Sequence, residues 1–312
     1  MDFAKHDNIK ILQALKRPDK KVKVLIDTDT YNEIDDQYAV AYAMRSGDKM
    51  EVVSICAAPF YNGRSESPAD GMEKSYNEIF NILKLAGVDD MNGKVHRGST
   101  AYLPDADTPV ESDAARNIVE SALSMPEGER LYIIALGAIT NVASAILINP
   151  SVVDKVVVLW LGGNALHWKN NREFNCCQDV HGAKVLFDSG APVVQFPCSG
   201  VVDRLLVTEP ELKYWLDGQN ELCRYLCEIT CDYSKEYSHG CAAWSKVIWD
   251  IAPVAWLAGS DNWMDECIVH SPVATLEHTY SSDLSRHFIK YIREINRDLV
   301  FEDLFNKLRI GD

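Results

Sequence analysis

Short apolar runs alternate with amphipathic segments through the first two thirds of the chain. The apolar runs are rich in β-branched residues and have the length of buried strands; they lie at 21–27, 51–58, 131–136, 156–163 and 191–196. Segments with helical spacing separate them, at 36–47, 73–87, 139–147 and 183–190. Because strand, helix and strand follow one another at this spacing, we predict right-handed crossovers and a mostly parallel, Rossmann-like central sheet flanked by helices.

The last third of the chain has a different pattern. From about Val201 onward, apolar residues recur at helical spacing, and we predict that this third is helical. The sequence contains no low-complexity linker, no internal repeat and no sharp change in composition. We therefore predict one α/β domain over residues 1–312.

Two polar, turn-rich loops interrupt the alternation, at 59–71 and 99–111, and we expect them to be mobile flaps. In an open parallel sheet, ligands bind beyond the carboxyl ends of the strands. The loops that follow residues 27, 58, 136 and 161 are therefore expected to meet at one functional edge.

The charge balance narrows the range of partners. Lys and Arg number 31 against 46 Asp and Glu, which gives a net charge of −15. A negative field of this size repels phosphate backbones and anionic membrane surfaces, so we expect small molecules and metal cations as ligands and neither nucleic acid nor membrane as a partner. The amino-terminal stretch lacks an apolar signal segment, and the nine cysteines do not form a small disulfide framework. We therefore expect a cytoplasmic protein.

The first predicted strand leads into an acidic loop. The stretch DTDTYNEIDD carries five carboxylates in ten residues: Asp27, Asp29, Glu33, Asp35 and Asp36. Carboxylates a few ångströms apart repel by about 4 kcal/mol per pair at an effective dielectric constant of 20. A shared proton or a divalent cation offsets this repulsion, and an oxygen-rich loop without Cys or His favours Ca²⁺ or Mg²⁺. The alternative is a solvated loop that caps the following helix.

The same loop permits a second catalytic interpretation. Asp27-Thr28-Asp29 after a strand is similar to the DxDx[TV] signature of haloacid dehalogenase-type phosphatases, in which the first Asp is the nucleophile. That signature requires Thr or Val two residues after the second Asp, and this chain has Tyr31 there.

Four segments together resemble the nucleoside hydrolases, the inosine–uridine preferring N-ribohydrolase family. DTDTYNEIDD (27–36) is similar to the family's DTDxGxDD signature, LGAITNVA (136–143) to LGPLTNLA, REFNCCQDVHGAK (172–184) to AEFNxxxDPEAA, and WDIAPVA (249–255) to the late HDPLA or WDxx element. VHRGS (95–99) also matches the usual VxxG turn. The resemblance covers about residues 22–260, and the agreement in order and spacing makes it specific.

The resemblance implies a calcium ion and a set of protein ligands. Asp29 matches a calcium ligand that is also the general base for the attacking water. The other implied ligands are Asp36, Asp250 and Thr140, the last through its main-chain carbonyl.

The resemblance also implies a group of residues that bind the ribose hydroxyls. Their counterparts here are Asp35, Asn62, Asn170 or Asn171, Glu173, Asn175 and Asp250. Asn164 is an alternative to Asn170 and Asn171. The alignment of Asn62 and of the two neighbouring asparagines depends on loops of unequal length.

The chain departs from the family pattern in three places. Five residues separate Asp29 from Asp35 where three are usual. The residue before the late Asp is Trp249 in place of the usual His, which is similar to the purine-preferring branch, and the His that often follows the VxxG turn is absent. We predict that Trp249 helps the base to leave. Other candidates for this role are Tyr31, Tyr61, His167, Trp168, Tyr237 and His239.

These features predict calcium-dependent hydrolysis of the N-glycosidic bond of ribonucleosides, with Asp29 activating the water. The candidate loops carry acids and no basic anion site, so water and not phosphate is the expected acceptor. The alternatives are a phosphatase with Asp27 as nucleophile and a non-catalytic, calcium-dependent protein that binds ribose or nucleosides. Because family members are commonly homodimers or homotetramers, we expect one of these assemblies.

Overall fold

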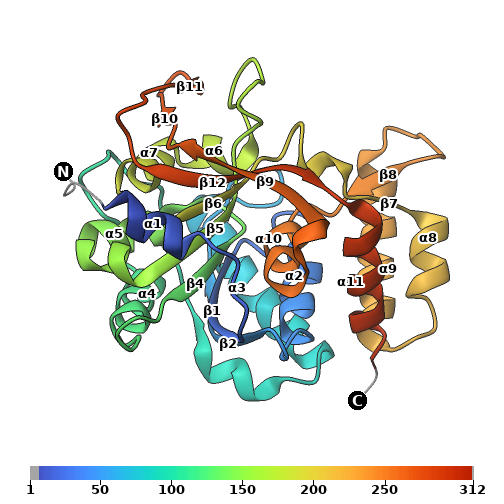
Figure 1. Ribbon diagram of the computed structural model, residues 1–312. Helices are drawn as coiled ribbons and strands as arrows, with labels where there is room; N and C mark the ends of the chain where they lie inside the picture. The colour runs from blue at the N-terminus through green and yellow to red at the C-terminus, as the bar shows by residue number, and fades with distance from the viewer. Residues whose placement is uncertain (1–6, 311–312) are drawn as a thin grey trace.

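Eight strands form one sheet in the computed structural model, which describes residues 7–310 (Figure 1). In spatial order they are β3 (Val95–His96), β2 (Met50–Ala57), β1 (Val22–Thr28), β4 (Leu131–Ala135), β5 (Val156–Leu161), β6 (Val193–Phe196), β12 (Phe288–Ile295) and β9 (Met264–His270). All neighbours pair in parallel except β12 and β9, which are antiparallel. The predicted mostly parallel sheet is confirmed.

Helices cover both faces of this sheet and enclose two hydrophobic cores. One core contains side chains of α4 (Asp113–Leu123), α5 (Thr140–Ile148) and α7 (Val180–Asp188). The other contains side chains of α2 (Asp36–Met44), α3 (Pro68–Leu85), α10 (Ile251–Ala258) and α11 (Arg297–Leu308). Along β1, Val24 and Ile26 pack into the second core and Leu25 packs into the first, because successive side chains of a strand alternate. Burial on both faces explains the continuous apolar runs in the sequence.

The remaining elements lie around this framework. They are α1 (Asn8–Ala14), α6 (Phe174–Gln178), α8 (Glu209–Trp215) and α9 (Glu221–Tyr237), with two small antiparallel pairs, β7 (Leu206–Thr208) with β8 (Ser245–Val247) and β10 (Val273–Ala274) with β11 (Tyr280–Ser281). Across residues 7–310, no helix is both long enough and apolar enough to cross a membrane. The described residues form a single α/β domain, as predicted.

The expectation of a helical last third needs a correction. Helices α8 to α11 are present, but residues 264–270 and 288–295 are strands of the main sheet. In β12, the apolar run at 288–292 fits either a buried strand or a helix, and its pairing between β6 and β9 decides in favour of the strand. The final helix begins only at Arg297, where the Asn296 side chain accepts a hydrogen bond from the Leu299 N–H and caps the helix.

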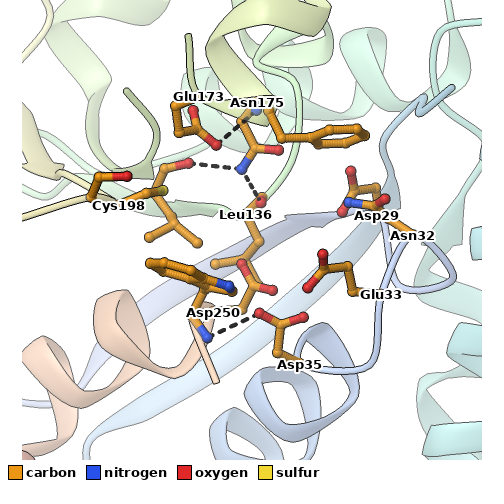
Figure 2. Close-up of a pocket in the computed structure, with 13 residues that line it drawn as sticks. Asp29, Asn32, Glu33, Asp35, Leu136, Glu173, Asn175, Cys198 and Asp250 are labelled. Atoms are coloured by element: carbon orange, nitrogen blue, oxygen red, sulfur yellow. Dashed lines mark hydrogen bonds between the residues drawn. The ribbon is translucent and has the colours of Figure 1, made fainter. Parts of the chain in front are cut away.

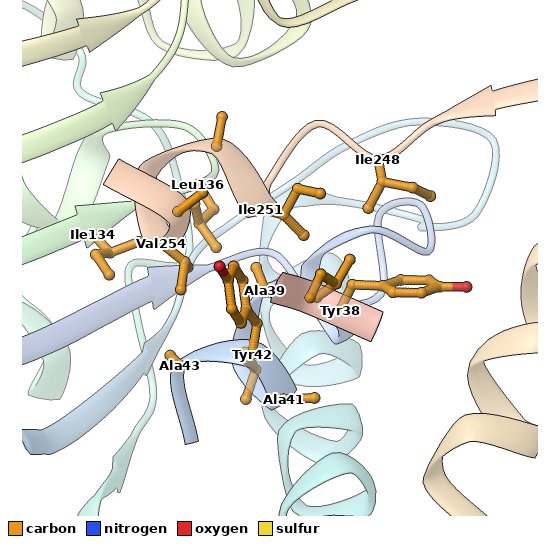
Figure 3. Packing of buried hydrophobic residues seen from close by; sticks show 14 of the residues in the cluster. Tyr38, Ala39, Ala41, Tyr42, Ala43, Ile134, Leu136, Ile248, Ile251 and Val254 are labelled. Carbon is orange, nitrogen blue, oxygen red and sulfur yellow. The ribbon is translucent and has the colours of Figure 1, made fainter. Parts of the chain in front are cut away.

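Helix α2 is buried on all sides, which is unusual for a helix beside a sheet. Tyr38, Ala39 and Tyr42 belong to the same core as Leu136 of the segment after β4 and Ile251 of α10, and the Tyr38 ring points away from Leu136 (Figure 3). The Tyr38 hydroxyl donates to the Leu226 carbonyl at 2.9 Å and so links α2 to α9. This packing fixes the start of α2, where the acidic loop ends.

Candidate active site

A cavity of about 240 Å³ opens near the carboxyl ends of β1, β4 and β5, the edge at which the sequence predicts a site (Figure 2). Six residues predicted from the sequence line it: Asp29, Asp35, Glu173, Asn175, Trp249 and Asp250. They come from three separate parts of the chain that the fold brings together.

Hydrogen bonds shape the acidic loop between β1 and α2. The Asn32 N–H donates to the Asp29 carbonyl at 2.7 Å and closes a turn. The Asp35 carboxylate accepts from the Trp249 N–H at 2.9 Å, which ties the loop to the segment before α10. Both bonds hold the loop against the cavity.

Four carboxylates converge where this loop meets the segment before α10. Ligand oxygens of Asp35, Asp36 and Asp250 lie within 4.8 Å of one another, and the Asp29 carboxyl is hydrogen-bonded to Asp36. Each of the four residues is at most 4% exposed. Within residues 7–310, Asp29 Oδ2 and Asp250 Oδ1 are buried without a hydrogen-bond partner. The cluster therefore has negative charge and free acceptor atoms that the surrounding protein does not satisfy.

Burial and mutual repulsion change the protonation of this cluster. Burial, followed by the charge of Asp35, raises the pKa of Asp36 to about 7. Burial and then the charge of Asp36 raise the pKa values of Asp29 and Asp250 well above the usual range for Asp. Without a cation, buried carboxylates this close together cannot all be ionised at once, and a divalent cation stabilises their charged forms. Hard oxygen donors suit Ca²⁺ or Mg²⁺. The residues present thus fit a metal ion.

Glu173 and Asn175 form the opposite wall of the cavity (Figure 2). The Glu173 carboxylate caps α6 and accepts hydrogen bonds from the N–H groups of Gly163, Asn175 and Cys176 at 2.8, 2.9 and 3.0 Å. The Asn175 side-chain amide donates to the carbonyls of Leu136 and Leu161 at 2.7 and 3.0 Å. Main-chain groups therefore fix both side chains at the ends of β4 and β5.

Thr140 lies at the start of α5, outside the set of residues that line the cavity. It is fully buried, and its hydroxyl donates to the Asp179 carboxylate at 2.6 Å. Leu136, four residues earlier, lines the cavity and turns its carbonyl oxygen toward Asn175 (Figure 2). Of residues 136–143, Leu136 is the one that lines the cavity.

The predicted loop asparagines lie behind the cavity. The Asn62 side chain donates to the Asn32 side chain at 2.6 Å, and Asn32 faces the cavity. Asn171 is buried and accepts from the Asn164 N–H at 2.7 Å, while the Asn170 carbonyl accepts from the Asn164 side chain at 3.3 Å. These bonds brace the segment before Glu173 but place none of the three predicted asparagines in the lining.

Of the residues predicted to help the base to leave, Trp249 lines the cavity. Tyr61, Trp168 and Tyr237 are 53%, 44% and 46% exposed and do not line it. Tyr31, His167 and His239 are also outside the lining.

Sequence reasoning did not assign several residues of the lining. They are Asn32, Glu33, Leu136, Leu161, Phe174, Cys198 and Ser199. For Asn32 and Glu33 a signal exists in the sequence, because both lie in the part of the acidic loop that exceeds the family length. The others follow strand ends or lie within a recognised motif, and no spacing rule points to them.

The phosphatase interpretation finds no support in the position of Asp27. This residue is fully buried, and its carboxylate accepts from the Asn141 side chain at 2.8 Å. Asp27 does not line the cavity, so its oxygens are not placed to attack a phosphate there.

Comparisons with known proteins agree with the motifs. The family model of the inosine-uridine preferring nucleoside hydrolase matches residues 24–283. The chain is 28% identical over 229 residues to probable uridine nucleosidase 2 of Arabidopsis thaliana, covering 66% of this chain and 68% of that protein. It is 24% identical over 159 residues to the inosine-uridine preferring nucleoside hydrolase of Crithidia fasciculata, covering half of each chain.

Solved structures show the same fold. The purine-preferring ribonucleoside hydrolase from Gardnerella vaginalis superposes with a TM-score of 0.74 at 19% identity, covering 92% of this chain and 98% of that chain. A plant nucleoside hydrolase superposes with a TM-score of 0.72 at 18% identity, covering 94% and 100% of the two chains.

The fold and the family match over most of the chain define a hydrolase that acts on N-glycosyl bonds. The chain belongs to the inosine-uridine preferring nucleoside hydrolase family. The resemblance that the motifs predict is confirmed.

Proposed function

We propose that this protein hydrolyses ribonucleosides to ribose and free nucleobase and that it does so with a calcium ion held by Asp29, Asp36 and Asp250. The observation that carries the proposal is the buried carboxylate cluster, with two unpartnered oxygens, beside a cavity of about 240 Å³. When bound, Ca²⁺ offsets the repulsion among these groups and lowers the pKa of a coordinated water.

Asp29 is the proposed general base. Its carboxylate lines the cavity, and its Oδ2 atom has no partner in the described part of the chain. A carboxylate in this position accepts the proton of the attacking water while the bond between the sugar and the base breaks. Because the water would be held close to the ribose carbon that it attacks, the reaction between them becomes effectively unimolecular.

Asp35, Glu173, Asn175 and Asp250 are the proposed ribose ligands. They surround the cavity, and three of them are carboxylates that accept hydrogen bonds from sugar hydroxyls. Positive charge develops on the ribose ring as the base departs. The fixed negative field of these side chains stabilises that charge in the transition state more than in the ground state.

Trp249 is the proposed contact for the departing base. Its ring lines the cavity beside Asp250, and stacking of a base on an indole contributes about 0.5–1.5 kcal/mol beyond burial. Asn62, Asn170 and Asn171 act as positioning residues through Asn32 and through the segment before Glu173. Thr140, the first residue of α5, is the proposed main-chain ligand of the ion.

A panel of ribonucleosides, incubated with the calcium-loaded protein and with protein treated exhaustively with EDTA, tests the proposal. We expect reducing-sugar release only in the calcium-loaded arm and its recovery when Ca²⁺ is added back. Full activity after EDTA treatment would remove the metal role. Nucleoside binding without ribose release would favour the non-catalytic binding protein instead. Adding Mg²⁺ in place of Ca²⁺ to the EDTA-treated protein shows which of the two ions supports hydrolysis.

The expected homodimer or homotetramer and the expected cytoplasmic location stay predictions. Light scattering of the purified full chain measures the oligomeric state, and fractionation of the source cells measures the location.

A further inference from the structure

Glu33 differs from the other acids of the loop because it is open to the cavity. Its side chain is 34% exposed and that of Asp35 is 3% exposed, while Asp29 and Asp36 are each 1% exposed as whole residues. Figure 2 shows Glu33 between Asp29 and Asp35 in the view, with its carboxylate directed into the cavity. This carboxylate is therefore available to a bound molecule.

A buried lysine holds the Glu33 side chain in this position. Lys246 Nζ lies 2.5 Å from Glu33 Oε2, and the Lys246 side chain is only 10% exposed. The same ammonium donates to the Val247 carbonyl at 2.9 Å and lies 3.9 Å from Asp35 Oδ1. Its hydrogens are thus directed at protein acceptors, so Lys246 orients Glu33 without offering a donor to the cavity.

The main chain of the loop is also fixed. The Arg64 guanidinium donates to the carbonyls of Glu33 and Asn32 at 2.8 and 3.3 Å and lies over the Tyr31 ring at 4.6 Å. Because both ends of the Glu33 side chain are held, its carboxylate is preorganised and loses little conformational freedom when a ligand binds.

The position of Glu33 assigns it to the base and not to the sugar. The proposed ribose ligands are Asp35, Glu173, Asn175 and Asp250, and three of them, Asp35, Asn175 and Asp250, are at most 5% exposed. Glu33 lies on the Asp29 side of the cavity, across from Cys198 (Figure 2). The Glu33 side chain is 34% exposed, so it lies nearer the cavity opening than these three ribose ligands do. When the ribose of a nucleoside reaches the buried ligands, its base lies toward the opening and therefore toward Glu33.

We propose that Glu33 is a specificity-determining residue that accepts a hydrogen bond from an exocyclic amino group of the leaving nucleobase. An ionised carboxylate offers only acceptors, with about four lone-pair sites, and the hydroxyl of Tyr233 and the ammonium of Lys246 occupy two of them. An amino group satisfies a remaining site, whereas a keto oxygen in the same place meets a like partial charge. This inference rests on the proposed nucleoside hydrolysis and names the preferred substrates as amino-bearing bases.

The test compares nucleosides that differ in one group, in the wild type and in Glu33→Gln and Glu33→Ala. The pairs are adenosine with purine riboside, which lacks the amino group, and cytidine with uridine, which has a keto group in its place. For each protein the ratio of kcat/KM within a pair is measured, so that intrinsic reactivity and the active fraction cancel when ratios are compared. Glu127→Gln, at an exposed site outside this cavity, is the matched control.

We expect the ratio of kcat/KM for the amino-bearing nucleoside to kcat/KM for its partner to fall by roughly 10- to 100-fold in the Glu33 variants. Loss of a hydrogen bond to a charged group weakens binding by about this factor. The control should keep the wild-type ratios. Ratios that stay within twofold of wild type in both variants overturn the inference while leaving the proposed hydrolysis standing.

If no nucleoside is hydrolysed, the proposed function fails separately. The same ratios are then taken from dissociation constants, measured by the change in tryptophan fluorescence on binding in the presence of Ca²⁺. A fall in the Glu33 variants supports the role of Glu33 in recognition, and unchanged ratios, or no measurable binding of either member of a pair, overturn it.

Discussion

The two walls of the cavity are held in place by different means. On one wall, Glu173 accepts from three main-chain N–H groups and Asn175 donates to two main-chain carbonyls. On the other wall, Asn32 and Glu33 depend on side chains that come from distant segments, namely Arg64, Lys246 and Asn62. A main-chain anchor is independent of single substitutions elsewhere, whereas a side-chain anchor is lost with one. The proposed sugar wall is thus fixed by the fold, and the proposed base wall is adjustable.

Asp29 belongs to neither wall, and its removal should have the largest effect. We expect Asp29→Asn to lower kcat by at least about 10³-fold, because it removes the proposed base and one charge at the cation site. The effect should be the same for every nucleoside, since it does not depend on the base. Ribose release measures the rate, and circular dichroism checks the fold. A loss that varies strongly with the base would assign Asp29 to the base wall instead.

The carboxylate cluster beside the sugar wall should make stability depend on pH and on the cation. Burial and the charge of Asp35 raise the pKa of Asp36 from the ordinary value near 3.8 to about 7. Between these values the folded state binds more protons than the unfolded state, so the free energy of unfolding falls as pH rises through this window. Each pKa unit corresponds to about 1.4 kcal/mol, so the loss is on the order of a few kcal/mol.

Calcium should compensate for this loss, because it replaces the protons. We expect the Tm difference between calcium-loaded and EDTA-treated protein to grow from pH 5 to pH 8. Taking the difference cancels carboxylates outside the cluster. Asp36→Asn removes one titrating group and should flatten the dependence. Parallel Tm curves for the two forms would show that the cluster does not bind the ion.

The sequence predicted the residues that regular structure positions. Asp29 and Asp36 flank a loop between a buried strand and a buried helix, and Asp250 directly precedes α10. Their places follow from the fold class and the motif order. The sheet was predicted for the same reason, since burial on both faces leaves continuous apolar runs.

Other features depend on pairings that spacing does not reveal. Glu33 and Lys246 are 213 positions apart, and their contact exists only after α9 and β8 have packed against the acidic loop. The strand at 288–295 was expected to be helical because its apolar run fits both structures until β6 and β9 pair with it. Motif order also left the direction of the Asn171 side chain open; its amide donates to Cys176 Sγ, and Asn171 does not line the cavity.

Loss of the lysine anchor should weaken the base wall more than the proposed ribose ligands, because Lys246 Nζ lies 2.5 Å from Glu33 Oε2 and 3.9 Å from Asp35 Oδ1. We expect Lys246→Met to lower kcat/KM for adenosine and cytidine by about tenfold, because Glu33 loses the partner that orients it. The kcat/KM for uridine should change less. Lys235→Met removes an exposed lysine of α9 and is the matched control. Equal losses for all four nucleosides would mean that Lys246 supports the whole site and not one wall.

The arginine that holds the loop backbone should have the smallest effect. Arg64→Lys keeps the charge but loses the planar group that lies over Tyr31 and donates to the Glu33 and Asn32 carbonyls. We expect KM for nucleosides to rise by about two- to fivefold with little change in kcat, since a single hydrogen bond contributes roughly 0.5–1.5 kcal/mol and Lys retains part of it. Inhibition by free ribose should be unchanged, because the Arg64 guanidinium contacts Asn32, Glu33 and Tyr31 and not the proposed ribose ligands. Arg116→Lys, at an exposed site, is the control. If ribose inhibition weakens together with nucleoside binding, the two walls are mechanically coupled and the division between a fixed and an adjustable side does not hold.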